Sequence, residues 1–344
     1  MKYNLADVCV RLSSGKGIPA KMIESSGRFP VYGGNGLRGY TKQSNFDGEC
    51  AIIGRQGAFC GNVRFFSGKA YMTEHAIVAV ANKDHNTRYL AYLLSTMSLG
   101  HLSAQSAQPG LSVKTLSKVT VDLPSKEEQD KAVSILSSLE DKIAKNSKIN
   151  DNLEQQAQAI YCDLFITNAN PSWQLGRLSD LITVRYGKDH KKLADGIYPV
   201  YGSGGIMRYV EKPLYDKESV LIPRKGTLNN VMYVNKPFWS VDTMFFTEMK
   251  LPNVAKFVFH FVKSKDLASL NAGSAVPSMT TDILNAMELP IPDADTFYRF
   301  ENIVAPLYQA MQQNTQESSK LAELRDSLLP RLMSGELDVS SIDL

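Results

Sequence analysis

The region from residue 125 to residue 166 carries apolar side chains at alternating steps of four and three residues. A mean step of ~3.5 residues predicts a helix that pairs with another in a left-handed coiled coil. Asn146 and Asn150 occupy two positions of this series, and a polar seam residue fixes register at a cost in stability. About 40 residues at ~1.5 Å each would make a helix of about 60 Å. The seam positions of this helix are Leu136, Leu139, Ile143, Asn146, Leu153 and Ile160.

The same pattern returns 168 residues later, over residues 293–335, and the two seams match position by position. Asn146 maps onto Asn314, and only Arg325, opposite Ala157, breaks the set. Pro306 lies in this second segment, so we expect it to kink the helix or to mark its first turn. Two unpaired helices covering their own domains are the alternative, but the shared seam favours a coiled coil. The second seam consists of Val304, Leu307, Met311, Asn314, Leu321 and Leu328.

Outside these helices, short apolar runs alternate with glycine-rich segments, which predicts strands and helices joined by turns. Four glycines interrupt residues 30–40, so we expect this segment to be a loop rather than regular structure. A second glycine loop follows at residues 54–61. Strands are predicted over residues 51–53, 63–66, 76–81, 119–123, 219–222 and 231–234, and shorter helices over residues 87–98 and 254–263.

One of the glycine segments occurs twice. FPVYGGNGLRGY (29–40) returns as YPVYGSGGIMRY (198–209), with six of twelve positions identical. An offset near half the chain length exceeds the ~20–50 residues of solenoid repeats and indicates a duplicated domain. We predict an α+β fold in which two similar globular α/β domains are separated and joined by two long helices, paired as an antiparallel coiled coil with a pseudo-twofold axis. The expected boundaries are residues 1–124 and 167–292 for the domains, 125–166 and 293–335 for the helices, and 336–344 for a tail.

Composition and charge narrow the class of protein. The 344 residues are 43% hydrophobic and 21% charged, which is typical of a soluble globular protein. A net charge of +3 permits a nucleic-acid partner, although the basic surface would have to be local. The sequence contains no run of ~18 apolar residues, so we expect no membrane span. The N-terminus lacks an apolar signal core. Four cysteines without a CxxC pair predict no zinc site and favour a reducing, cytoplasmic location.

The order of domain, helix, domain, helix would place two readers at a set separation, which suits two half-sites on duplex DNA. Glycines let the backbone approach a phosphate closely, and basic or amide side chains beside them can contact phosphates and base edges. Solvated charges and structural glycines are the alternative. The residues predicted to contact DNA in the first domain are Lys16, Arg38, Lys42, Arg55, Gln56, Asn62 and Arg64. Those in the second domain are Lys188, Lys191, Lys192, Arg208, Arg224, Lys225, Asn229 and Asn230.

The ordered motifs resemble the specificity subunit of type I restriction–modification systems over nearly the whole chain. They include PVYGGNG and PVYGSGG, each followed by an Ile-x-Arg-x-Gly turn (53–57 and 222–226). They also include QPGLS (108–112), VPSMT (276–280), DLPSKEEQ (122–129) and LRDSLLPRLMSGELDV (324–339). The second domain departs from the pattern at its helix entry, with PDADTF (292–297) where the first has PSKEEQ.

The resemblance implies two target recognition domains that each read half of a bipartite site in double-stranded DNA, while the paired helices set the unread gap. It also implies partners: two methyltransferase (modification) subunits that carry S-adenosylmethionine and methylate adenine, and a restriction subunit that uses ATP and Mg²⁺. The chain itself would hold no cofactor, no metal and no catalytic residue.

Two other functions remain as alternatives. A DNA methyltransferase in its own right would need a cofactor-binding βα motif and an NPPY-like stretch, and the sequence contains neither. Glu74 and His75 suggest a hydrolase, but the second copy has Asp242 and Thr243, so structural carboxylates are favoured. A coiled-coil scaffold that never binds DNA would use the helices equally well. The target sequence is not predictable, because base readout depends on loop conformation and DNA shape.

Overall fold

The computed structural model describes residues 1–103, 110–270, 278–340 and 342. The loop motifs at 108–112 and 276–280 therefore lie partly outside the described residues, as does the end of the predicted tail. The chain divides into two compact units: unit 1 is Met1–Asn146 with Thr315–Leu344, and unit 2 is Ser147–Asn314. Each unit thus combines one predicted globular domain with part of each long helix.

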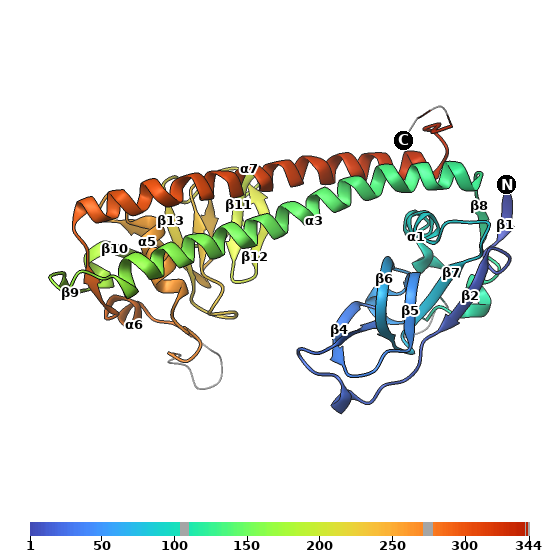
Figure 1. The fold of residues 1–344 in the computed structure, drawn as a ribbon, viewed down its shortest axis with the longest axis horizontal. Helices are drawn as coiled ribbons and strands as arrows, with labels where there is room; N and C mark the ends of the chain where they lie inside the picture. The colour runs from blue at the N-terminus through green and yellow to red at the C-terminus, as the bar shows by residue number, and fades with distance from the viewer. Residues whose placement is uncertain (104–109, 271–277, 341, 343–344) are drawn as a thin grey trace. The chain divides into compact units, whose positions relative to one another are not determined.

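The two predicted helices are α3 (Lys126–Cys162) and α7 (Ala294–Met333) (Figure 1). A π-helical turn, η4 (Asp163–Thr167), extends α3. Ser125 and Glu128 form a reciprocal cap at the start of α3, since the Glu128 carboxylate accepts from the Ser125 backbone at 2.9 Å. Asp293 caps α7 by accepting from the Thr296 backbone at 2.7 Å, which holds the pKa of Asp293 below its usual value. Both helix entries therefore have a side-chain cap despite their different sequences.

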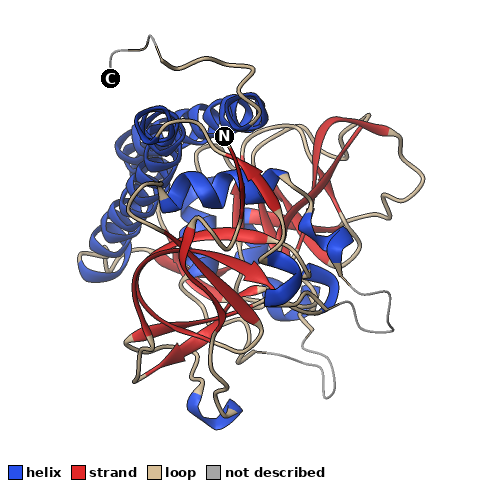
Figure 2. Ribbon diagram, turned by 90° about the vertical axis from the view of Figure 1, so that its right-hand side faces the viewer, coloured by secondary structure: helices blue, strands red, loops and turns tan. Residues whose placement is uncertain are grey.

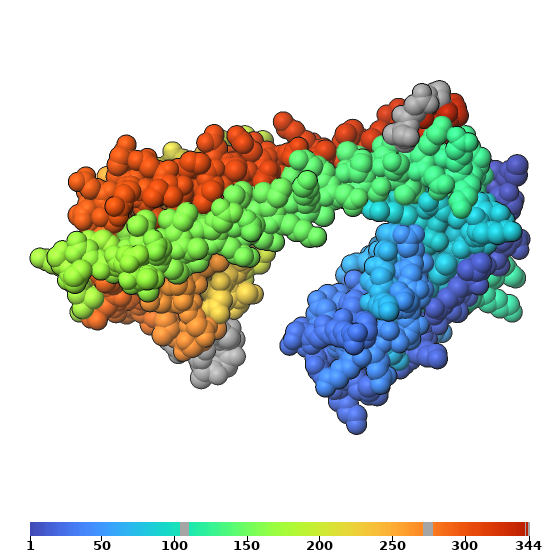
Figure 3. Space-filling view, viewed as in Figure 1, coloured from blue at the N-terminus to red at the C-terminus, as the bar shows by residue number. Residues whose placement is uncertain are grey.

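Within each unit the segments of α3 and α7 run antiparallel and touch (Figure 3). In unit 1, the Asn146 amide donates to Glu317 at 2.7 Å and to Ser318 at 3.2 Å. In unit 2, the Asn314 amide donates to Asn150 at 2.9 Å, and Asn150 donates to a backbone oxygen of α7 at 3.2 Å. All twelve predicted seam side chains are buried or half-buried. Pro306 lies in the interior of α7 rather than in its first turn.

The core of unit 1 is a six-stranded sheet with the order β2-β7-β5-β6-β3-β4. The separate pair β1-β8 joins the two ends of this domain. Figure 2, which draws the strands in red, shows that several of them curve strongly rather than lying flat. The elements are β1 (Lys2–Asn4), β2 (Cys9–Ser14), η1 (Ala20–Met22), β3 (Phe29–Gly33), β4 (Gly36–Thr41), β5 (Phe46–Gly54), η2 (Gly57–Phe59), β6 (Val63–Met72), β7 (Ala76–Ala81), α1 (Thr87–Thr96), η3 (Leu99–Leu102), α2 (Val113–Leu116) and β8 (Thr120–Asp122).

Unit 2 repeats this topology with one interruption. Its sheets have the orders β10-β16-β13-β14 and β12-β11-β15, so β14 and β15 together take the place of β6. The pair β17-β9 corresponds to β1-β8. The elements are β9 (Gln174–Arg177), α4 (Leu178–Leu181), β10 (Ile182–Tyr186), β11 (Asp195–Gly202), β12 (Gly205–Val210), β13 (Ser219–Pro223), β14 (Met232–Val234), β15 (Trp239–Ser240), β16 (Met244–Met249), α5 (Ala255–Lys263), α6 (Thr281–Asn285) and β17 (Glu288–Ile291).

The prediction of a loop over residues 30–40 is wrong, because the segment forms a β-hairpin of β3 and β4. Its equivalent in unit 2 is the hairpin of β11 and β12. Each hairpin has a two-residue turn, followed by Gly36 at φ +98° or Gly205 at φ +111°. A Cβ at Gly39 would lie 2.6 Å from the backbone oxygen of Glu24, so this glycine allows a close approach within the strand.

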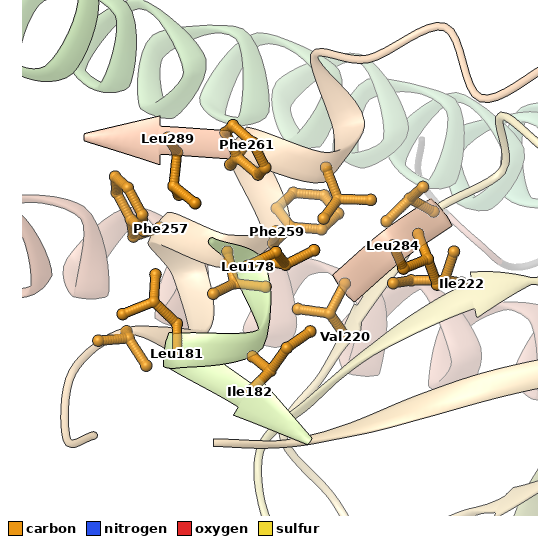
Figure 4. Packing of buried hydrophobic residues seen from close by; sticks show 14 of the residues in the cluster. Leu178, Leu181, Ile182, Val220, Ile222, Phe257, Phe259, Phe261, Leu284 and Leu289 are labelled. Carbon is orange, nitrogen blue, oxygen red and sulfur yellow. The ribbon is translucent and has the colours of Figure 1, made fainter. Parts of the chain in front are cut away.

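Each domain is packed against its part of the long helices by a continuous apolar core. In unit 1 the core includes Leu136 of α3 and Leu332 of α7, together with apolar side chains of β5, β7 and α1. In unit 2, Phe257, Phe259 and Phe261 of α5 converge on residues from α4, β10 and β13 (Figure 4). Among the described residues, no helix is long and apolar enough to cross a membrane.

Candidate nucleic-acid interface

The loop after β5 in unit 1 is fastened to a tight turn at residues 73–75. The Arg55 backbone donates to His75 at 3.0 Å, and the Arg55 carbonyl accepts from the Leu111 backbone at 2.8 Å. The Arg55 guanidinium also reaches the backbone oxygen of Glu74, at 3.4 Å. These bonds hold Arg55 at both its backbone and its side chain, so its position depends on the surrounding fold and not on the loop alone.

The loop after β13 in unit 2 is fastened in the same way to a turn at residues 241–243. The Arg224 backbone donates to Thr243 at 2.9 Å, and its carbonyl accepts from the Met279 backbone at 2.9 Å. The Arg224 guanidinium reaches the backbone oxygen of Asp242 at 3.4 Å. The two arginines therefore occupy equivalent places in the two units.

A lysine lies on the other side of each turn. Lys16 follows Gly15, and Lys188 follows Gly187. A Cβ would lie 2.1 Å from a backbone oxygen at Gly15 and 2.0 Å at Gly187, so only glycine permits this approach to the turn. We call Lys16 and Arg55 around residues 73–75, and Lys188 and Arg224 around residues 241–243, the basic corner of each unit.

The hairpins described above pack directly against the basic corners. Thr73 donates from its backbone to Tyr32 of β3 at 2.9 Å, and Val241 donates in the same way to Tyr201 of β11 at 3.1 Å. In unit 2 the Asn230 amide also donates to a backbone oxygen of the hairpin turn, at 2.8 Å. The glycine-rich segments that repeat in the sequence thus meet at one place in each unit.

The side chains at the two corners differ although their backbones agree. In unit 1, Gln56 contacts the His75 ring at 3.0 Å, and the other ring nitrogen lies 3.2 Å from the Glu74 carboxylate. In unit 2 the corresponding positions are Lys225 and Thr243, and Lys225 is exposed. Both units have a carboxylate here, at Glu74 and Asp242, but unit 1 presents a linked amide and imidazole where unit 2 presents a cation and a hydroxyl.

Tyr186 is a further residue of the corner of unit 2, and the sequence interpretation missed it. The Arg224 guanidinium carbon lies 5.3 Å from the centre of the Tyr186 ring. That ring packs edge-on against the buried Phe245, with ring centres 5.0 Å apart. Its sequence signal is an aromatic residue next to the Gly187-Lys188 pair; the corresponding residue in unit 1 is Ser14.

Two further predicted residues of unit 1 lie over the hairpin turn. A Cβ at Gly36 would lie 2.6 Å from the Arg64 guanidinium, and one at Gly33 would lie 2.8 Å from the Arg38 side chain. Both arginines are exposed. Asn62 ends the loop after β5 through backbone bonds, and its side chain is exposed as well.

Other predicted residues lie away from the corners or are engaged in contacts within their unit. Lys42 follows the last residue of β4, at the end of the hairpin opposite its turn. The exposed Lys191 and Lys192 belong to the segment between β10 and β11. Arg208 donates to Asp195 at 2.9 Å. The Asn229 amide donates to the carboxylate of residue 266 at 3.0 Å, and this bond lowers the pKa of that carboxyl. A DNA contact by any of these residues stays a prediction.

Among the residues that the structure describes, no three His, Cys, Asp or Glu side chains form a group that could hold a metal ion.

Nearly the whole chain matches one family model. The model for the type I restriction modification DNA specificity domain matches residues 1–155 and again residues 170–324. The two matches follow the duplication seen in the sequence and the repeated topology of the two units.

Proteins similar to this chain are specificity subunits. One is the type I restriction enzyme EcoprrI specificity subunit of Escherichia coli, 40% identical over 131 residues, which are 37% of this chain and 33% of that relative. Another is the putative type I specificity subunit S.MpnORF507P of Mycoplasma pneumoniae, 23% identical over 343 residues, with 94% of this chain and 93% of the relative covered.

The fold also agrees with a solved structure, that of a type I restriction–modification S subunit from M. genitalium. The TM-score is 0.65 at 19% identity, with 96% of this chain and 95% of the other covered. These comparisons confirm the resemblance, the α+β fold class and the predicted class of protein, a specificity subunit rather than a catalytic one. The chain belongs to the type I restriction modification DNA specificity domain family.

Proposed function

We propose that the chain is the specificity subunit of a type I restriction–modification complex and that each unit reads one half of a bipartite DNA site. The observation that carries the proposal is the pair of basic corners. They share their backbone hydrogen bonds but differ in side chains at Gln56 and Lys225. Two readers of different half-sites need this combination, because a common scaffold positions the backbone and different side chains contact different bases.

The long helices would then act as a ruler and as a docking platform. Each contributes to both units, and α3 and α7 pack antiparallel within each unit. In this proposal two methyltransferase subunits bind the helices and supply S-adenosylmethionine for adenine methylation. A restriction subunit supplies ATP- and Mg²⁺-dependent cleavage. The chain itself binds no cofactor and acts in the cytoplasm.

Methylation-site sequencing of DNA from a host that carries the complete system tests the proposal. The expected result is a motif of two defined halves separated by a gap of constant length. DNA-binding measurements over a range of salt concentrations should show a steep decrease in affinity, because phosphate contacts release counterions. Salt-independent binding, or none, would favour the coiled-coil scaffold. Methyl transfer by the isolated chain would favour a methyltransferase in its own right.

Two kinds of variant test the globular domains, which would read the half-sites, separately from the long helices, which would set the gap. Lys225→Ala should weaken or relax reading of the second half-site alone, and Gln56→Ala is the matched change in unit 1. Equal loss at both half-sites would contradict the model of two readers. One extra heptad in both long helices should change the tolerated gap and leave the half-sites unchanged, since a heptad preserves the seam. New half-site sequences would contradict the role of the helices as a ruler.

A further inference from the structure

We propose that Arg224, stacked on Tyr186, reads a guanine in the half-site of unit 2 and is a specificity-determining residue of that unit. The inference rests on the proposed function, because it assumes that unit 2 reads part of a DNA site. It goes beyond that function by naming the base, the residue that contacts it and the aromatic ring that holds this residue in place.

The Tyr186 ring is a rigid support for the guanidinium. The distance of 5.3 Å from the guanidinium carbon to the ring centre lies within the range of a cation–π contact. Phe245, which is fully buried, packs against the same ring in an edge-to-face arrangement, with an interplanar angle of 68°. Tyr186 is nevertheless 52% exposed, so the stacked pair is open to a ligand.

Arg224 keeps most of its hydrogen-bonding capacity for that ligand. A guanidinium has five N–H donors, and among the described residues one bond, to the backbone oxygen of Asp242 at 3.4 Å, engages the Arg224 side chain. No ion pair among the described residues includes Arg224. The backbone of Arg224 is held at both its N–H and its carbonyl. The side chain is therefore oriented by its surroundings without being neutralised by them.

A planar donor pair in a fixed orientation can match a base edge, although the same pair can also bind a phosphate. Guanine presents two acceptors, O6 and N7, in the major groove, and arginine can donate to both at once. Lys188 and Lys225 are exposed at the same corner, and their positive charges can neutralise phosphates. The corner thus combines one positioned arginine, which we assign to the base edge, with two lysines available for phosphates.

The corner of unit 1 lacks this support. Arg55 has the same backbone bonds, but Ser14 stands where unit 2 has Tyr186. The cation–π contacts of the described residues do not include Arg55. Unit 1 therefore provides a matched position in which the arginine is present without its ring.

The test compares methylation motifs produced by the complete complex carrying variants of the chain. Arg224→Lys keeps the positive charge but removes the pair of parallel N–H donors of the guanidinium. The preference for guanine over the other bases at one position of the second half-site should therefore fall about 10- to 100-fold, the range for a bidentate contact. Tyr186→Leu should relax the same base by a smaller factor, about 3- to 10-fold, whereas Tyr186→Phe should retain it. Arg185→Ala, which removes an exposed arginine paired with Glu248, is the control and should leave the motif unchanged.

Several outcomes would overturn the inference. A second half-site with no G·C pair would do so, and so would uniform weakening on all sequences in Arg224→Lys or Arg224→Ala, because a phosphate contact has that signature. If Arg224→Ala fails to fold, Arg224→Lys and the two Tyr186 variants still decide. Absence of any bipartite motif in the wild-type complex would instead overturn the proposed function itself.

Discussion

Both units hold a cation between the helix of the globular domain and a long helix, and the two arrangements differ. In unit 1, Arg88 of α1 lies over Phe65, with the guanidinium carbon 4.9 Å from the ring centre, and donates to Glu140 of α3 at 2.6 Å. Tyr92 completes the group by accepting from Arg88 at 3.0 Å and donating to Glu140 at 2.5 Å. Each polar group therefore has a partner on another element.

The corresponding cation of unit 2 is Lys256 of α5, 168 residues after Arg88. Its ammonium lies 2.5 Å from Glu301 of α7 and 3.4 Å from Glu218, and it lies over the rings of Tyr233 and Tyr308. Its side chain is 5% exposed, against 21% for that of Arg88. The comparison teaches that both domains fasten to a helix by a cation at one position, and that unit 2 buries this charge more deeply.

The largest effect is expected from Lys256→Met. The substitution leaves Glu301 half-buried without its cation, which should destabilise unit 2 by about 3–5 kcal/mol. The matched Arg88→Met should destabilise unit 1 by only about 1–2 kcal/mol, because water reaches both of its charges. Hydrogen exchange of the amides in α5 and α1 measures the two units separately.

The double variant Lys256→Met/Glu301→Leu is the control for this prediction. It removes both charges, so it should recover most of the stability lost in the single variant. If Arg88→Met proved as damaging as Lys256→Met, the difference in burial between the two anchors would not matter for stability.

The second effect is a pH dependence of unit 2, due to His260. Burial lowers the pKa of His260 to about 4, from 6.5 in the unfolded chain. Between these values the unfolded chain binds the proton and the folded one does not, so stability is lost as pH falls from about 6.5 to 4. The shift corresponds to about 3 kcal/mol. The His260 ring bridges Gln158, at 2.8 Å, and Tyr308, at 2.9 Å.

Hydrogen exchange of the α5 amides, measured between pH 7 and pH 4, reports this loss of stability in unit 2. The variant His260→Gln is the control. The variant should flatten the dependence in unit 2, whereas α1 of unit 1, with Tyr92 at the position of His260, should change less over the same range. An equally steep dependence in His260→Gln would assign the effect to carboxylates instead.

A third and smaller effect concerns the hydroxyl of Tyr92. Tyr92→Phe removes the group that bridges Arg88 and Glu140 but leaves the ion pair intact, so unit 1 should lose about 1–2 kcal/mol. In unit 2 the matched Tyr308→Phe removes one bond to a neutral imidazole and should cost less, about 1 kcal/mol. Denaturant unfolding of the two variants gives the comparison, and a larger loss for Tyr308→Phe would reverse it.

The sequence predicted the features that depend on periodicity. The seams around Asn146 and Asn314 identified both long helices, and the offset between the two glycine segments identified the duplication. Residues 30–40 were interpreted as a loop because glycine by itself disfavours regular strands and helices. In the structure, Gly39 lets β4 approach the backbone of Glu24, which precedes the hairpin, and propensity cannot report a tertiary contact of this kind.

The candidate site was predicted in part for a related reason. Arg55 and Arg224 were found because they recur beside glycines in both copies. Tyr186 was missed because it has no aromatic counterpart in the first copy, where Ser14 stands. Arg208 and Asn229 were predicted to contact DNA from residue type and place in the sequence; their bonds to Asp195, on the paired strand, and to Asp266 could not be predicted in that way, because residue type does not report which neighbours the fold supplies. Repetition thus identifies the scaffold of a site better than the residues in which its two copies differ.

The smallest expected effect lies in the helix seam, where each unit has its own polar contact. Asn146→Leu removes a bond to the Glu317 carboxylate, which is exposed and can return to water, and a longer bond to the half-buried Ser318 hydroxyl, while it adds apolar burial in the seam. The two terms should nearly cancel, so the free energy of unfolding of unit 1 should change by less than about 1 kcal/mol. Asn150→Leu removes an amide partner of Asn314 and a bond to the backbone oxygen of Met311, both half-buried. It should therefore destabilise unit 2 by about 1 kcal/mol, because less accessible partners are harder to solvate. Hydrogen exchange within α3 resolves the two cases, and a greater loss for Asn146→Leu would mean that its seam contact, rather than that of unit 2, holds the helices together.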